Sequence, residues 1–185
     1  MKIKYKIIFS IIILMICQTG SAFDGKRKGP VFSLGIGYND SNLNTKTSGS
    51  STKENLNGLT SVFRAGYGFN EEFFLYIERK DGFFYQTIGT NSVLWDSTLT
   101  GIGLTYFFLK DDSSPYFTVS YGYGQQFALK ETGFNKYHGI AYKAGIGYQR
   151  SNFAIEFAAV RKELSSGNTY ITTDTFLVTC HILMF

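Results

Sequence analysis

The chain has 185 residues, of which 44% are hydrophobic and 17% aromatic, with 20 glycines and only 2 prolines. Its 18 basic and 14 acidic residues give a formal net charge of +4, but three of the lysines fall within the first six positions. Without that leader the chain is close to neutral, so its charge gives no reason to expect nucleic-acid binding.

Residues 1–22 have the pattern of a secretory signal peptide. Three lysines precede an apolar run from Ile7 to Ile16, and small residues follow at 20–22. The run is shorter than the ~20 apolar residues of a membrane-spanning helix, and bulky Ile16 argues against a lipoprotein cut before Cys17. We therefore predict a signal peptide at 1–22 and one domain at 23–185. Cys180 is then the only cysteine left, which excludes an intramolecular disulfide, and we expect it to pack as a small apolar residue.

The rest of the chain alternates between large apolar residues and small or polar ones with a period of two, which is typical of β-strands. No window shows the three-to-four residue apolar spacing of an amphipathic helix over a useful length. The alternation predicts eight strands, at 31–38, 59–69, 73–78, 101–108, 117–124, 139–148, 153–159 and 170–185.

The composition of the two strand faces distinguishes a membrane barrel from a soluble sandwich. One face is aliphatic and aromatic, whereas the other is mostly Gly, Ala, Ser and Thr with a few charges; Phe63 and Tyr67, for example, alternate with Gly66 and Gly68. Glycine weakens an exposed strand, but small side chains suit the narrow interior of an eight-stranded barrel. The large face must then point outward, into lipid.

The predicted connections alternate in length. Three are short, at 70–72, 110–115 and 149–152, and four are longer and polar, at 39–58, 80–91, 125–137 and 162–169. Short periplasmic turns and longer extracellular loops give this alternation in outer-membrane barrels.

Outward aromatic residues gather at the short-turn ends of the predicted strands. Such a ring of aromatic side chains marks a membrane interface. The predicted periplasmic girdle consists of Phe32, Phe69, Phe73, Phe108, Phe117, Tyr148, Phe153 and Phe185.

These features resemble the small eight-stranded outer-membrane barrels of Gram-negative bacteria, the OmpA-, OmpX- and OmpW-like proteins, over everything after the signal peptide. The resemblance implies an all-β, eight-stranded, antiparallel up-and-down transmembrane barrel in the cell outer membrane, among its lipids and lipopolysaccharide. It also implies that the barrel assembly machinery reads the C-terminal Phe185. The facing of the last strand stays open, because an outward Phe185 places His181 and Thr179 outward too, whereas polarity favours the opposite phase. The fourth strand shows a similar slip between Leu99 and Ile102.

Two cations and two carboxylates fall on the inward face of the predicted strands. Unpaired charge in such a place is costly, and the turn register sets the first cation opposite the first carboxylate. These lumen charges either line a polar conduit or proton path, or form a salt-bridge plug. We favour the plug, because the interior of an eight-stranded barrel is only just wide enough for side chains. The residues are Arg64, Glu78, Lys143 and Glu156.

Other candidate chemistry is sparse. The two histidines, His138 and His181, lie on distant strands, and no cluster offers three metal ligands. The Gly-x-Gly units lack the following helix that a phosphate site requires. We therefore predict no catalytic, cofactor-binding or metal-binding residue, and no enzyme.

Two function classes remain. The first is a structural or surface-interaction protein that presents polar loops, above all 39–58, to extracellular partners. The second is a narrow channel or lateral-release pathway for small or hydrophobic molecules, against which inward Phe74 and Tyr76 argue. A third and more distant class, a lipid-A-modifying enzyme, would need the His-x-Ser motif and following acid of such barrel enzymes, which the sequence lacks.

Overall fold

The computed structural model describes residues 27–88, 91–129 and 136–185. The predicted signal peptide at 1–22 lies outside these residues. None of the described residues forms a helix long and apolar enough to span a membrane.

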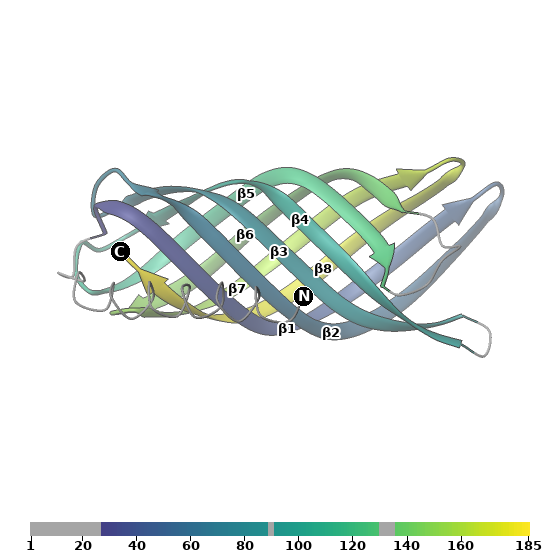
Figure 1. Cartoon of the computed structure of the whole chain (residues 1–185), viewed down its shortest axis with the longest axis horizontal. Helices are drawn as coiled ribbons and strands as arrows, with labels where there is room; N and C mark the ends of the chain where they lie inside the picture. Colours follow the sequence, from purple (N-terminus) through teal and green to yellow (C-terminus); the bar gives the residue numbers. More distant parts are fainter. Residues whose placement is uncertain (1–26, 89–90, 130–135) are drawn as a thin grey trace, which may run out of the picture.

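Eight antiparallel strands follow one another around a closed barrel, each paired with its neighbours in sequence, and the last strand pairs with the first. This confirms the predicted all-β, up-and-down architecture (Figure 1). The strands are β1 (Gly29–Thr47), β2 (Ser50–Gly68), β3 (Phe73–Ile88), β4 (Asn91–Phe107), β5 (Ser113–Ala128), β6 (Tyr137–Arg150), β7 (Phe153–Ser166) and β8 (Thr169–Met184).

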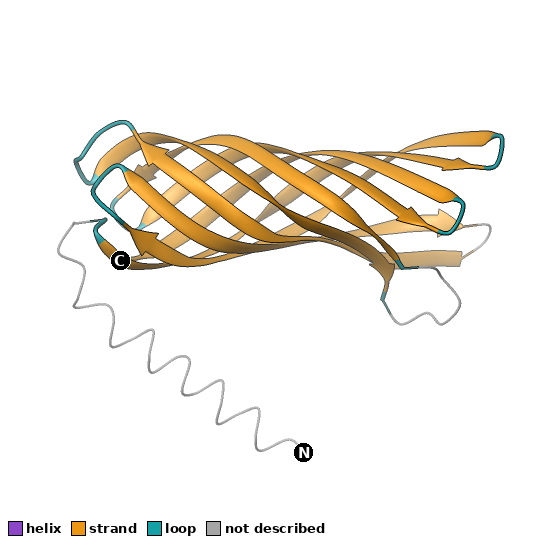
Figure 2. Ribbon diagram, turned by 90° about the horizontal axis from the view of Figure 1, so that it is seen from above, coloured by secondary structure: helices purple, strands orange, loops and turns teal. Residues whose placement is uncertain are grey.

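The predicted long loops are largely strand instead. The segment 39–58 continues β1 and β2, and a two-residue turn joins them at Ser48 and Gly49, whose φ angles are 21° and 93°. Positive φ at both central residues is what a tight hairpin turn demands. Sequence alternation missed these extensions because both of their faces are polar beyond the membrane. Figure 2 shows the extended hairpins at one end of the barrel. The short turns and the C-terminus lie at the other end.

The strand register fixes the stagger of the barrel. Following paired residues once round the sheet leads from Ser33 on β1 to Leu43 on the same strand, a shift of ten residues. A closed sheet with such a shift has strongly tilted strands. The tilt is visible in Figure 1, and it brings residues of β2 and β3 level with residues of β6 and β7 across the lumen.

The two faces of the sheet are inverted relative to a soluble protein. Large apolar side chains cover the outer wall; Ile36, for example, is 74% exposed, and Ile146 is 63% exposed. The interior carries glycine, small hydroxyl residues and buried charges, together with clusters of buried apolar and aromatic side chains. This distribution is that of a barrel whose outer belt faces lipid.

Some inward glycines allow close approach of neighbouring strands. A Cβ atom on Gly101 of β4 would collide with the carbonyl oxygen of Tyr121 on β5, which is backbone and cannot move aside. A Cβ atom on Gly82 of β3 would meet the flexible end of Lys80 at 3.3 Å. Only the first glycine is therefore required by the backbone packing.

These two glycines provide a matched pair of variants. We expect Gly101→Ala to lower the free energy of unfolding by about 1–3 kcal/mol, the usual cost of overpacking, because the β4–β5 pairing must distort. Gly82→Ala should cost markedly less. Urea unfolding of the refolded barrel in lipid vesicles measures both, and equal costs would contradict the close approach.

Candidate functional site: the charged lumen

Four charged residues, here called the charge quartet, meet inside the barrel. Arg64 on β2, Glu78 on β3, Lys143 on β6 and Glu156 on β7 are each at most 3% exposed. The register sets Arg64 directly opposite Glu78, whereas β6 and β7 form the far wall. The quartet has two positive and two negative charges and therefore balances itself.

Ion pairs within the quartet run along the wall and across the lumen. The guanidinium of Arg64 donates from Nε to Glu78 Oε2 at 2.6 Å and from an Nη to both oxygens of Glu156 at 2.7 and 2.8 Å. The ammonium of Lys143 donates to Glu78 Oε2 and, at 3.3 Å, to Glu156 Oε1. Each cation thus contacts both carboxylates. Paired, hydrogen-bonded charges of this kind are the form in which charge is tolerated in a dry interior.

Aromatic side chains and a histidine surround the quartet. The hydroxyl of Tyr116 donates to Glu156 Oε2 at 3.3 Å, and the guanidinium of Arg64 lies 5.1 Å from the centre of the Tyr76 ring. His181 is buried nearby, with its ring nitrogens 3.1 Å from Ser33 Oγ and 2.8 Å from Thr179 Oγ1. The contacts of Tyr116 and Tyr76 help to hold Glu156 and Arg64 of the quartet in place.

Apolar clusters lie inside the barrel on both sides of the quartet. Every buried side chain of these clusters is at most 9% exposed. The lower plug, near the short turns, consists of Val31, Phe74, Tyr76, Phe107, Tyr116, Ala154 and Leu183. The upper plug, near the extended hairpins, consists of Leu43, Leu56, Phe84, Val93, Trp95, Leu164 and Ile171.

Two further lysines lie inside the barrel between the quartet and the upper plug. Lys80 and Lys162 are each 1% exposed, and Lys162 donates to Ser97 Oγ at 2.7 Å. Neither forms an ion pair with a carboxylate in the described part of the chain. The sequence analysis assigned both to loops; continuing the two-residue period from Glu78 and Glu156 would have placed them on the inward face.

Arg27, just before β1, occupies the short-turn mouth of the barrel. Its guanidinium donates to the carbonyl oxygens of Glu71, Leu109 and Asp111 at 3.1, 2.8 and 2.5 Å and to Gln149 Oε1 at 3.1 Å. It also lies 4.2 Å from the centre of the Phe107 ring. One side chain therefore ties together the turns after β2 and β4 and the end of β6, and it covers the lower plug.

Burial lowers the pKa of Arg27, and the carboxylates of Glu71, Asp112 and Asp111 oppose that shift. Arginine nevertheless stays protonated at neutral pH, so its five donors remain available for the carbonyl oxygens. Sequence analysis missed this residue, because a single cation before the first strand carries no periodic signal.

Seven of the eight aromatic residues predicted for the girdle are exposed at the short-turn end, with exposed fractions from 39% to 65%: Phe32, Phe69, Phe73, Phe108, Phe117, Tyr148 and Phe153. Phe185 is a correction to that set, since it is partly buried and packs against the lower plug. Along β8 the inward side chains fall at odd positions, including Thr179 and His181. Phe185 therefore shares the inward phase, and the phase favoured by polarity is the one observed.

The fourth strand has no slip. Leu99 is fully buried and faces the lumen, while Ile102 is 62% exposed on the outer wall. Inward residues occupy the odd positions from Val93 to Phe107 without interruption. Leu99 is an apolar residue on the inward face. In the sequence, its apolar character suggested that the alternation between the two faces shifts by one residue.

The remaining predicted chemistry does not assemble into a reactive site. His138 is exposed on β6, whereas His181 is inside the barrel. No group of three or more His, Cys, Asp or Glu side chains able to hold a metal ion occurs among the described residues. Cys180 is exposed on the outer wall of β8. It therefore faces lipid and is not packed in the protein as expected.

Comparison with known proteins places this architecture in a class. No protein-family model and no curated protein matches the chain. Among solved structures, Ail of Yersinia pestis in complex with the heparin analogue sucrose octasulfate has a TM-score of 0.57 at 17% identity, covering 84% of this chain and 99% of that one. Neisserial surface protein A gives 0.52 at 14% identity, with 82% and 97% covered. The outer membrane protein OprG from Pseudomonas aeruginosa gives 0.50 at 11%, with 86% and 97% covered.

At these identities the likeness concerns the fold alone. A closed eight-stranded barrel with an apolar outer belt defines a transmembrane β-barrel. The structural neighbours are small outer-membrane barrels of Gram-negative bacteria. The chain accordingly has the fold of the small, eight-stranded outer-membrane barrels.

The charge quartet makes a prediction about stability. We expect Glu78→Ala to lower the free energy of unfolding by about 3–5 kcal/mol, as for other broken buried ion pairs, because Arg64 and Lys143 are left to share Glu156. The double variant Arg64→Ala/Glu78→Ala should cost less than the two single effects summed, since Lys143 and Glu156 remain as a neutral pair. Urea unfolding of the refolded barrel measures all three.

The control is Arg79→Ala, which breaks the 3.0 Å ion pair to Asp81 with an arginine side chain that is 58% exposed. Pairs of that kind contribute at most about 1 kcal/mol. Additive costs for Arg64→Ala and Glu78→Ala would contradict the coupling inside the lumen.

Arg27 makes a second prediction. We expect Arg27→Ala to lower the free energy of unfolding by about 1–3 kcal/mol, the cost of leaving buried acceptors without a donor, and to speed hydrogen exchange of the amides in the turn at 108–112. Lys28→Ala, which changes the exposed neighbouring cation, should leave both unchanged. Equal exchange in the two variants would show that Arg27 does not hold the turns.

Proposed function

We propose that this protein is a sealed outer-membrane barrel with a structural and surface-interaction role, and not a channel or an enzyme. The observation that carries the proposal is the filled lumen. The lower plug, the charge quartet and the upper plug succeed one another along the barrel, and their side chains are almost fully buried. A lumen packed in this way transmits no solute. The role of the barrel is then to anchor the extended hairpins in the membrane.

The extended hairpins support the interaction role. β2 pairs with β3 only from Gly58 to Gly68, so the upper part of β2, from Ser50 to Asn57, has no partner strand on that side among the described residues. Its residues are mostly exposed and polar. An open strand edge can accept an extended segment of another chain by strand addition. The upper part of β2 therefore suits a partner that presents an extended backbone.

The experiment that tests the sealed lumen is conductance of the purified barrel in planar bilayers. We expect no discrete openings from the unaltered protein, because the lumen is filled with packed side chains. The matched comparison is Arg64→Ala/Glu78→Ala, which shortens two interior side chains and does not change the net charge of the lumen. Reproducible openings of the unaltered barrel whose size changes in that variant would support the channel alternative instead.

A further inference from the structure

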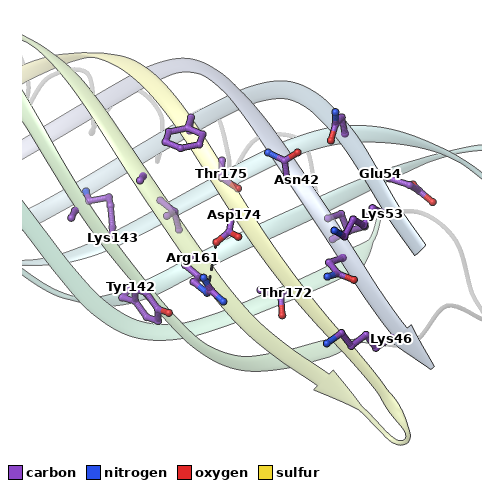
Figure 3. Close-up of a pocket in the computed structure, with 17 residues that line it drawn as sticks. Asn42, Lys46, Lys53, Glu54, Tyr142, Lys143, Arg161, Thr172, Asp174 and Thr175 are labelled. Carbon is purple, nitrogen blue, oxygen red and sulfur yellow. Dashed lines mark ion pairs between the residues drawn. The ribbon is translucent and has the colours of Figure 1, made fainter. Parts of the chain in front are cut away.

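Two adjoining hollows run along the outer wall of the barrel on β6, β7, β8 and β1, and the upper one also reaches the upper part of β2. The lower hollow has a volume of about 580 Å³ and the upper one about 860 Å³. They share Ala144, Ala159 and Phe176 in their linings, so they form one continuous groove on the lipid-facing side. Figure 3 shows the upper hollow with its polar side chains.

The strand register explains why the wall is hollow here. Ala144 on β6 lies directly opposite Ala159 on β7, and both point outward. The pairs on either side along the same strands carry large side chains, Ile146 with Phe157 and Tyr142 with Arg161. Two opposed alanines between large neighbours thus form the floor of the groove.

The lower hollow is largely apolar, with Asp40 as the charged residue in its lining, and lies within the outer belt. Besides the alanine floor, its walls include Tyr38, Ile146, Phe157 and Val178. All four are at least 42% exposed and face outward. A groove of this shape and polarity at this depth fits a hydrocarbon chain of the surrounding membrane.

The upper hollow is polar and lies toward the extended hairpins. Four cationic residues line it, Lys46, Lys53, Arg161 and, from the charge quartet, Lys143, whose side chain is buried in the barrel. Arg161 forms an ion pair with Asp174 at 3.7 Å (Figure 3). The other polar lining residues include the amides of Asn42, Asn44 and Asn55 and the hydroxyl of Thr172. Cations suit phosphate, whereas amides, hydroxyls and carboxylates suit the hydroxyl groups of a sugar.

We propose that this groove binds a phosphorylated glycolipid of the outer leaflet, with an acyl chain on the Ala144–Ala159 floor and the saccharide headgroup in the upper hollow. The change from apolar to polar lining along one groove matches the change from chain to headgroup in such a lipid. The inference goes beyond the proposed function, because the groove is on the outer wall and the side chains proposed to contact the lipid face outward.

The test is lipid retention by the folded barrel in native mass spectrometry. The barrel is equilibrated in micelles with equal amounts of lipopolysaccharide-derived lipid A and phosphatidylglycerol. Close packing drives association within a membrane, so filling the floor with Ala159→Trp or Ala144→Trp should lower lipid A retention by about tenfold. The paired change Lys46→Ala/Lys53→Ala should also lower it, because it removes two of the three cations of the hollow that face outward.

The matched control is Ala65→Trp, which places the same ring on the outer wall of β2, opposite Phe32 and Ile77 and outside the groove. It should retain lipid A as the unaltered barrel does. Two floor variants keep the test usable if one fails to fold. Unchanged retention in a folded floor variant, equal loss in the control, or equal retention of phosphatidylglycerol by the unaltered barrel would each overturn the proposal.

Discussion

The balance of charge inside a dry lumen is the constraint on which the rest of this structure depends. A single unpaired ion in such a place costs several kcal/mol, yet four charged side chains of the quartet are buried together. They are tolerated because each cation reaches both carboxylates. Arg64 extends from β2 to Glu156 on β7 at 2.7 and 2.8 Å, so the same contacts that neutralise the charges also join opposite walls of the barrel.

The stagger of the sheet makes that balance geometrically possible. Pairing along the sheet brings Arg64 next to Glu78, but only the ten-residue shift on closure brings Glu156 to the same level across the lumen. Small residues on the inward face leave space for the long charged side chains. On the outer wall small residues have the opposite effect, since the opposed Ala144 and Ala159 leave a groove. Small residues on the inward face thus make room for charged side chains that fill the lumen, whereas small residues on the outward face leave a groove in the outer wall.

The sequence predicted most of the fold because the lipid-facing belt imposes a period of two on every strand. It placed Arg64 and Glu78 on one face and set them opposite each other, since a short turn fixes the register of a hairpin. Contacts across the lumen could not be predicted, because they depend on the closure shift, which no local pattern encodes. The upper strand extensions were missed for a related reason: above the membrane both faces are polar, and the alternation disappears.

Two errors came from single residues at the ends of the pattern. Phe185 was assigned to the girdle from its aromatic character, but its odd position on the phase of β8 directs it to the lower plug. Arg27 has no periodic context, yet it contacts three separate segments at the short-turn mouth. The positions of Arg27 and Phe185 depend on contacts with turns and strands that are distant in the sequence. Such contacts form only when the barrel has closed, so the local sequence pattern does not reveal them.

The two inward lysines above the quartet lack the counter-charges that the quartet supplies to its own members. Lys80 and Lys162 are each 1% exposed, and neither forms an ion pair with a carboxylate in the described part of the chain. An isolated ammonium is costly in a dry interior, where such a group gives up its proton instead. Water admitted along this lumen would let both side chains take up protons, and rings of positive charge favour anions over cations. Anion preference is thus a property that these two residues would give to a hydrated form of the barrel.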